Sequence, residues 1–204
     1  PTPPAGYSTP TAELVFYLSA NNTARGVVNA SLTSYRPVSG FGSGDRYVIL
    51  FGSTVTSASL VSLQFFTGTP SLSLPTPWPS GSLSVNQTAH PSISGLSYPG
   101  NDLRAYQIGL QVPAQIYYTA TLSKGWLGNA TSYSLPDLSA PSLLGYTAPS
   151  SGSGTFEVTA LLSNKSILAA DDSALLAFAA GDYLRLARAF TNSYTVGGGN
   201  INLP

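Results

Sequence analysis

Short apolar runs separated by turn-forming residues are the feature of this sequence that most restricts its fold. The runs are rich in β-branched and aromatic side chains, as strands are, and the glycine, proline, asparagine and serine residues between them indicate turns. We expect strands at residues 11–19, 25–33, 46–51, 58–67, 82–85, 92–96, 103–112, 115–122, 156–162 and 167–170. About ten to twelve short strands in succession predict an all-β fold, an antiparallel β-sandwich.

The stretch Asp171–Phe190 is compatible with two structures. An aspartate at its start could cap a helix, and two arginines would lie near the C-terminus of that helix, where cations are favourable. Gly181 and Asp182 interrupt such a helix, however, and residues 183–190 alternate as a strand does. The sequence leaves helix and hairpin open and favours the strand.

The first twenty residues are unlike the start of a self-contained domain. Four prolines among the first ten residues keep this leader extended and poor in backbone donors. The apolar run Thr11–Ser19 follows, and in a strand its side chains would point alternately to two faces. One face would carry Leu14, Phe16 and Leu18, and the other would carry Val15 and Tyr17.

A strand that is apolar on both faces needs cover on both sides. Residues 11–19 are therefore either the first strand of their own sandwich or a strand lent to a neighbouring molecule. We expect a tail or donor strand over residues 1–20 and a β-sandwich head domain over residues 21–204.

Charged residues are scarce in this chain. Lys and Arg number 8, Asp and Glu also number 8, and the charged fraction is 8%, against about 25% in ordinary soluble domains. Few native ion pairs can then be lost in acid, which is the usual route of acid denaturation, so we expect a surface suited to low pH. The dispersed basic residues form no footprint for nucleic acid, and no apolar run approaches the roughly 18 residues of a membrane span.

Five Asn-X-Ser/Thr sequons point to N-glycosylation. They start at Asn21, Asn29, Asn86, Asn129 and Asn164. All but the second lie in expected turns, where a glycan would project into solvent. The sequons predict an extracellular or cell-surface glycoprotein with N-linked glycans as its modification and no cofactor.

Catalytic chemistry finds little support in the sequence, and we expect no enzymatic activity, no catalytic residue and no metal site. His90 is the only histidine, and no Gly-X-Ser-X-Gly elbow accompanies it. Asp171 and Asp172 form the one acidic pair, outside any calcium-loop motif. Several aromatic residues could line a sugar-binding platform, although packing is their commoner use: Trp78, Tyr117, Tyr118, Trp126, Tyr133 and Tyr146.

The proline-rich leader with its apolar strand, the sequons, the low charge and the absence of cysteine and methionine together resemble the archaeal thread-type cell-surface filament subunits of thermoacidophiles. These are similar in plan to the donor-strand chaperone–usher pilins, whose domains are immunoglobulin/pilin-like β-sandwiches. Chaperone–usher pilins usually carry a disulfide, and this chain departs from them in having none.

The resemblance implies a structural subunit of an extracellular pilus or thread that serves adhesion or cell–cell contact. Identical subunits would assemble head-to-tail by donor-strand complementation, a form of strand addition. The donor strand would contribute Leu14, Val15, Phe16, Tyr17 and Leu18 to the groove of the next subunit.

Three alternatives remain open from the sequence. The chain could be a monomeric carbohydrate-binding or adhesin β-sandwich module, in which residues 11–19 pair within their own domain. It could instead be an S-layer or viral capsid subunit. Finally, the donated strand could be the C-terminal one, residues 194–203, which contains three consecutive glycines.

Overall fold

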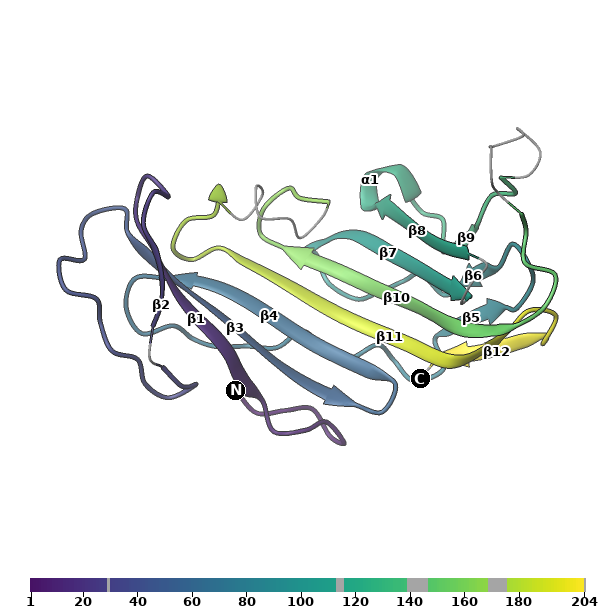
Figure 1. Cartoon of the computed structure of the whole chain (residues 1–204), viewed down its shortest axis with the longest axis horizontal. Coiled ribbons are helices and arrows are strands. Elements are labelled where there is room, and N and C mark those ends of the chain that lie inside the picture. Colours follow the sequence, from purple (N-terminus) through teal and green to yellow (C-terminus); the bar gives the residue numbers. More distant parts are fainter. Residues whose placement is uncertain (29, 113–115, 139–146, 169–175, 204) are drawn as a thin grey trace. The chain divides into compact units, whose positions relative to one another are not determined.

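The computed structural model describes residues 1–28, 30–112, 116–138, 147–168 and 176–203. Their secondary structure is almost entirely antiparallel strand (Figure 1), which confirms the predicted all-β fold. The elements are β1 (Thr11–Leu18), β2 (Arg25–Val27), β3 (Arg46–Val55), β4 (Ala58–Phe66), β5 (Leu83–Asn86), β6 (Ser92–Ser94), β7 (Leu103–Val112), β8 (Ile116–Ser123), α1 (Lys124–Leu127), β9 (Ser132–Ser134), β10 (Ser153–Ser163), β11 (Tyr183–Thr195) and β12 (Asn200–Leu203).

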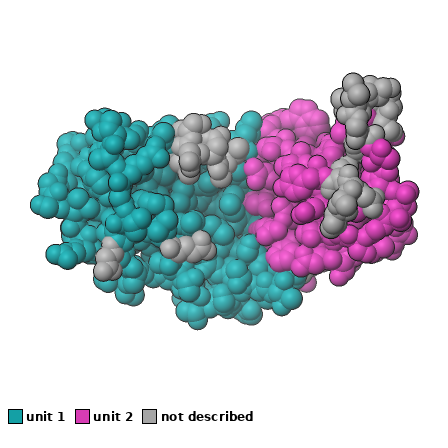
Figure 2. Space-filling view, in the orientation of Figure 1, with its two compact units in different colours: residues 1–77, 161–187 teal, residues 78–160, 188–204 magenta. Residues whose placement is uncertain are grey.

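The chain divides into two compact units (Figure 2). Unit 1 consists of residues 1–77 and 161–187, and unit 2 consists of residues 78–160 and 188–204. The chain crosses between the units after Pro77, within β10 and within β11. The expected tail over 1–20 and head over 21–204 concern assembly between copies, and they stay a prediction.

Unit 1 is built on one antiparallel sheet in the order β2-β1-β3-β4-β11. β3 is buried along most of its length, as its nearly continuous apolar sequence predicts. One face of the sheet carries a buried cluster of Val15, Val28, Tyr47, Ile49, Phe51 and Phe66. Side chains from two loop segments, among them Phe41 and Leu72, pack against that cluster, so loops cover this face.

Unit 2 contains two sheets, in the orders β11-β10-β7-β8 and β12-β5-β6-β9. Alternate residues of β7 and β5 are buried, including Ile108, Leu83 and Val85, each at 0% exposure. Trp78 lies between Pro77 and Pro79 in a proline-rich stretch, and its side chain is buried. Its ring lies 4.9 Å from that of Tyr98, so this stretch is anchored in the core of unit 2.

Two expected strands are wrong in whole or in part. The strand expected at 25–33 is only the three-residue β2, because the Ser31 hydroxyl accepts the backbone N–H groups of Thr33 and Ser34 and so forms a local turn in place of a ladder. Residues 167 and 168 are not in a strand, and the rest of the expected strand 167–170 lies outside the described residues.

The ambiguous stretch Asp171–Phe190 is a strand where it is described most fully. β11 begins at Tyr183 and pairs with β10, whose Ser163 donates its hydroxyl to the Tyr183 carbonyl at 2.7 Å. This confirms the favoured strand for residues 183–190. Asp171 and Asp172, either of which could cap the alternative helix, lie outside the described residues.

Candidate functional site: β1 and its groove

β1 lies between a long strand and a very short one (Figure 1). Its register with β3 runs from Thr11 opposite Gly52 to Leu18 opposite Arg46, with a bulge between Ala12 and Leu14. On its other side stands β2, whose three residues are all exposed. β1 is thus held chiefly by β3, and only a minimal strand separates it from the edge of the sheet.

The two faces of β1 meet different surroundings. Val15 is 3% exposed and packs into the cluster around Tyr47, whereas Leu18, on the opposite face, is 9% exposed. The other three predicted donor residues are half-buried: Leu14, Phe16 and Tyr17. All five therefore lie in a single strand of unit 1, where they pair within their own chain.

We call the place that β1 occupies the β1 groove. Its backbone edge is β3 from Arg46 to Gly52. On one face it is lined by Val28, Tyr47 and Ile49, and on the other by Val48, Leu63 and Phe65. On that second face an apolar hollow of about 140 Å³ adjoins Phe16 and Leu18.

The second face of the sheet is less well covered than the first. Half-buried apolar side chains continue across it from β1 to the neighbouring strands, at Leu14, Phe16, Leu50 and Leu63. Contiguous, incompletely covered apolar surface is typical of association sites.

Asp45, just before β3, is hydrogen-bonded to residues at the end of β1. Its carboxylate accepts hydrogen bonds from the Gly42 N–H at 2.8 Å, the Tyr17 hydroxyl at 2.9 Å and the Ala20 N–H at 2.9 Å. These bonds, the Gly42 one foremost, hold the pKa of Asp45 below its usual value. Nothing in the sequence around Asp45 indicates this role.

The lowered pKa of Asp45 predicts how the stabilisation of β1 by this carboxylate depends on pH. Its ionised form stabilises the folded state above the unfolded-state pKa of about 3.9, and that contribution is lost as pH falls through the lower folded-state pKa. We expect Asp45→Asn to melt at a lower temperature than the wild type at pH 7, with the two curves converging in strong acid. Thermal melts followed by circular dichroism between pH 2 and pH 7 measure this.

The matched comparison is Tyr17→Phe, which keeps the Asp45 charge and removes one of its three donors, so it should reproduce only part of the pH-dependent loss. A constant gap between Asp45→Asn and the wild type at every pH would contradict the assignment.

The leader before β1 is fastened to the end of β3. Ser8 donates its N–H to the Thr54 carbonyl at 2.8 Å, and its hydroxyl accepts the Thr54 N–H at 3.0 Å. The Ser53 hydroxyl donates to the Ser8 carbonyl. The proline-rich leader has no alternating apolar pattern, so this pairing could not be predicted from the sequence.

Four of the five sequon asparagines are exposed, namely Asn21, Asn86, Asn129 and Asn164, and Asn29 lies outside the described residues. Asn86 does not lie in the expected turn. It ends β5, opposite Asn200 of β12 and Ser92 of β6. Asparagine is uncommon in strands, so the sequence did not indicate this position. Asn86 is placed there by the pairing of β5 with β12 on one side and with β6 on the other.

The hydrogen bonds of these asparagines predict which sequons carry a glycan. The Asn164 amide nitrogen, where a glycan would attach, donates to the Asp182 carboxylate at 3.0 Å and to the Gly181 carbonyl at 3.3 Å. At Asn21 the contact with Thr23 involves the side-chain oxygen, which accepts a hydrogen bond from the Thr23 hydroxyl at 2.7 Å. We expect glycans at Asn21, Asn86 and Asn129 and little or none at Asn164. Glycopeptide mass spectrometry of native protein tests this, and full occupancy of Asn164 would contradict it.

The candidate aromatic platform does not gather at one place. Trp78 is buried, whereas Tyr117 and Trp126 are 74% and 69% exposed. The Trp126 ring has Tyr133 as its neighbour, edge-on at 6.0 Å between centroids. Tyr118 is half-buried, and Tyr146 lies outside the described residues.

The sequence has few of the side chains that commonly serve in catalysis or metal binding. His90 does not stand alone: its Nε2 lies 3.1 Å from the Asp137 carboxylate. Within the described part of the chain, no three His, Cys, Asp or Glu side chains come together as metal ligands would. No described helix has the length and apolar character needed to cross a membrane.

Comparison of the chain with known protein families, curated proteins and solved structures finds no match.

Proposed function

We propose that this chain is a structural subunit of an extracellular, N-glycosylated filament in which β1 of one copy occupies the β1 groove of the next. The observation that carries the proposal is the position of β1. This strand is apolar on both faces, bonded along its length to β3, and shielded on its other side by only three exposed residues. Main-chain bonds would set the register, and alternate side chains would fill the groove.

Exchange between copies preserves the contacts that β1 makes. A second copy presents the same strand, so every bond to β3 and every apolar contact in the groove can be remade. The connection that must open is the turn Ser19–Ala24, where Ser19 donates to the Ala24 carbonyl at 3.0 Å. Asn22 there has a φ of 59°. Extending these six residues would span up to about 20 Å.

The geometry of such an exchange leads to a filament. Each copy gives a strand through one surface and receives one through another, and a head-to-tail contact of this kind propagates unless the rotation closes a ring. The half-buried apolar face that includes Leu14 and Leu50 would contribute further contact area. The partners are identical copies of the chain, and no cofactor or catalytic step enters.

A disulfide trap tests the exchange directly, because the chain has no cysteine of its own. Val15 lies opposite Ile49, and the Val15 carbonyl bonds to Val28 on the β2 side at 2.8 Å. Val15 and Ile49 therefore form a non-hydrogen-bonded pair, whose Cα spacing of about 4.5 Å lies within the range that a disulfide can bridge. In assembled material, oxidised Val15→Cys/Ile49→Cys should run as a covalent ladder of multimers on non-reducing denaturing gels.

The matched control is Thr54→Cys/Ser59→Cys. These residues face each other in the β3–β4 hairpin and belong to one chain in either arrangement, so this variant should run as a monomer. If the Val15/Ile49 variant also runs as a monomer from assembled material, β1 stays in its own chain and the proposal is wrong. If the native protein never assembles, the alternative of a monomeric binding module replaces it.

A further inference from the structure

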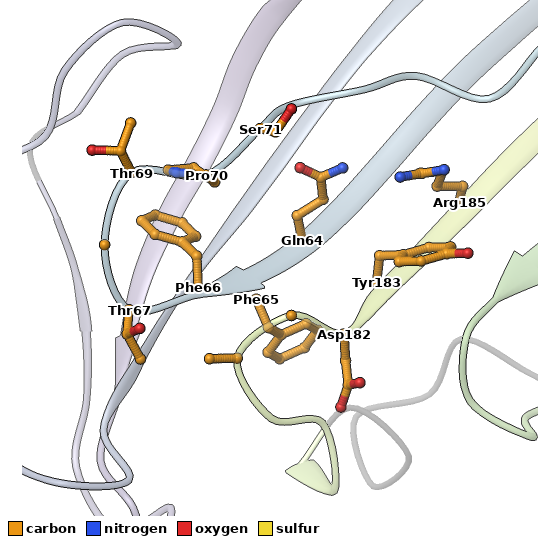
Figure 3. A pocket seen from close by; sticks show the side chains of 13 residues that line it. Gln64, Phe65, Phe66, Thr67, Thr69, Pro70, Ser71, Asp182, Tyr183 and Arg185 are labelled. Atoms are coloured by element: carbon orange, nitrogen blue, oxygen red, sulfur yellow. The ribbon is translucent and has the colours of Figure 1, made fainter.

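A polar hollow of about 420 Å³ lies in unit 1, where β4 ends and β11 begins (Figure 3). The segment from Thr67 to Ser71 passes over it. Gln64 of β4 and Arg185 of β11 point into the hollow from the sheet, on the side of Ser71. None of the residues of β1 lines it, so the hollow is independent of the proposed strand exchange.

Arg185 is held in a fixed orientation in this hollow. Its guanidinium carbon lies 4.0 Å from the centroid of the Tyr183 ring, which is a cation–π contact. One terminal nitrogen donates to the Ser73 hydroxyl at 2.7 Å. Its Nε is buried and has no hydrogen-bond partner. The ring contact and the Ser73 bond fix the guanidinium, so a ligand would meet its terminal nitrogens and not the buried Nε.

The charge of Arg185 is not balanced locally. Asp182 also borders the hollow, but its side chain points to the opposite side of the sheet (Figure 3). There it accepts the Ala179 N–H at 2.7 Å and pairs with Lys165 at 3.2 Å. Among the residues that the structure describes, no acidic side chain lies within ion-pair distance of Arg185. The hollow is therefore positively charged.

The remaining lining suits a sugar ring. Thr67, Thr69 and Ser71 are exposed and offer hydroxyls, whereas the amide nitrogen of Gln64, which is 5% exposed, already donates to Ser73 at 3.4 Å. Pro70 also lines the hollow and is half-buried, so it gives an apolar surface beside these hydroxyls. The volume falls in the range of about 300–1,000 Å³ that is usual for small-molecule sites.

We infer that this hollow binds an acidic saccharide, with the sugar carboxylate against Arg185 and the ring hydroxyls against the Thr67–Ser71 segment. Guanidinium and carboxylate match in shape and charge. A bare carboxylate would leave the hydroxyl groups of that segment unused, and a neutral sugar would leave Arg185 without an anion. Tight binding therefore needs both parts of the ligand.

Calorimetric titration of the full chain with glucuronic acid, acetate and glucose tests this. We expect glucuronic acid to bind about 10- to 100-fold more tightly than glucose, the ratio that one charge-assisted hydrogen bond supplies, and more tightly than acetate. Equal binding of acetate would make the hollow a simple anion site. Equal binding of glucose, or no binding of glucuronic acid at millimolar concentration, would overturn the inference as well.

Variants then assign the binding to this hollow. Arg185→Gln should weaken glucuronic acid binding about 10- to 100-fold, whereas Arg36→Gln, the same change at an exposed arginine, should leave it unchanged. Because Arg185 is partly buried, Thr69→Ala/Ser71→Ala serves as a second variant at two exposed positions, and it should bind several-fold more weakly with an unchanged melting temperature. Wild-type affinity in both variants would place the binding elsewhere and overturn the assignment.

Discussion

Replacing Tyr47 by alanine is expected to lower the free energy of unfolding by about 3–5 kcal/mol, as for other large aromatic side chains in a core. Tyr47 is 2% exposed, and its ring is stacked on Phe41 at 4.9 Å. It also lies 4.9 Å from the Tyr35 ring and 5.5 Å from the Phe66 ring. Alanine would leave a cavity where β3, β4 and the covering loop meet. Guanidinium chloride unfolding followed by circular dichroism measures the loss, because both tryptophans, Trp78 and Trp126, lie in unit 2 and would not report on this core.

The conservative variant Tyr47→Phe separates the ring from its hydroxyl. The hydroxyl accepts the Val38 N–H at 2.8 Å, and losing that one bond should cost about 1 kcal/mol. Tyr117→Ala, at a side chain that is 74% exposed, should change stability by less than about 0.5 kcal/mol. If Tyr47→Ala costs no more than Tyr47→Phe, the ring cluster does not hold this face of unit 1 together.

The strands that sequence analysis placed well have strong local patterns. β7 has the bounds that its alternation predicts, and β3 starts where its apolar run starts. β9 was missed because its three residues, Ser132–Ser134, contain a single apolar side chain between two serines. Its place comes from pairing with β6, and such a long-range partner leaves no mark on a three-residue sequence.

The division into two units is only partly visible in the sequence. The chain crosses from unit 1 to unit 2 between Pro77 and Trp78, in a proline-rich stretch, but the other two crossings carry no such signal. β10 and β11 are continuous strands, yet the boundary falls at residue 160 in one and at residue 187 in the other. Neither place carries the glycine or proline signals that suggest domain linkers. Cores are separated by which side chains meet in space, and that depends on the pairing of all strands together.

The candidate site was predictable in one strand and hidden elsewhere. The two-faced apolar pattern of residues 14–18 marks β1 in the sequence itself. Asp45 is hidden, because its partners Tyr17 and Ala20 are 28 and 25 residues away. Arg185 and Ser73 are 112 residues apart. Hydrogen bonds over such distances are set by topology, which local periodicity does not encode.

Deleting residues 1–20 is expected to abolish self-assembly and to leave unit 1 unable to hold its fold. The deletion removes two buried and three half-buried apolar side chains of β1. Their burial is worth on the order of 6–10 kcal/mol before ordering costs, which is comparable with the whole stability of about 5–15 kcal/mol of a typical domain. Unfolding measurements and electron microscopy of the truncated protein test both parts.

A synthetic peptide of residues 8–20, added in trans, should restore the truncated protein, because it supplies the strand that the β1 groove lacks. The same peptide with Val15→Asp and Leu18→Asp is the matched control, since a charge at either buried position should prevent insertion. The truncated protein can still receive a strand but cannot give one, so adding it to full-length protein should shorten the filaments in proportion to its amount. If instead it assembles alone as the full chain does, β1 is not the donor, and β12, which pairs with β5 at the edge of its sheet, becomes the strand to test.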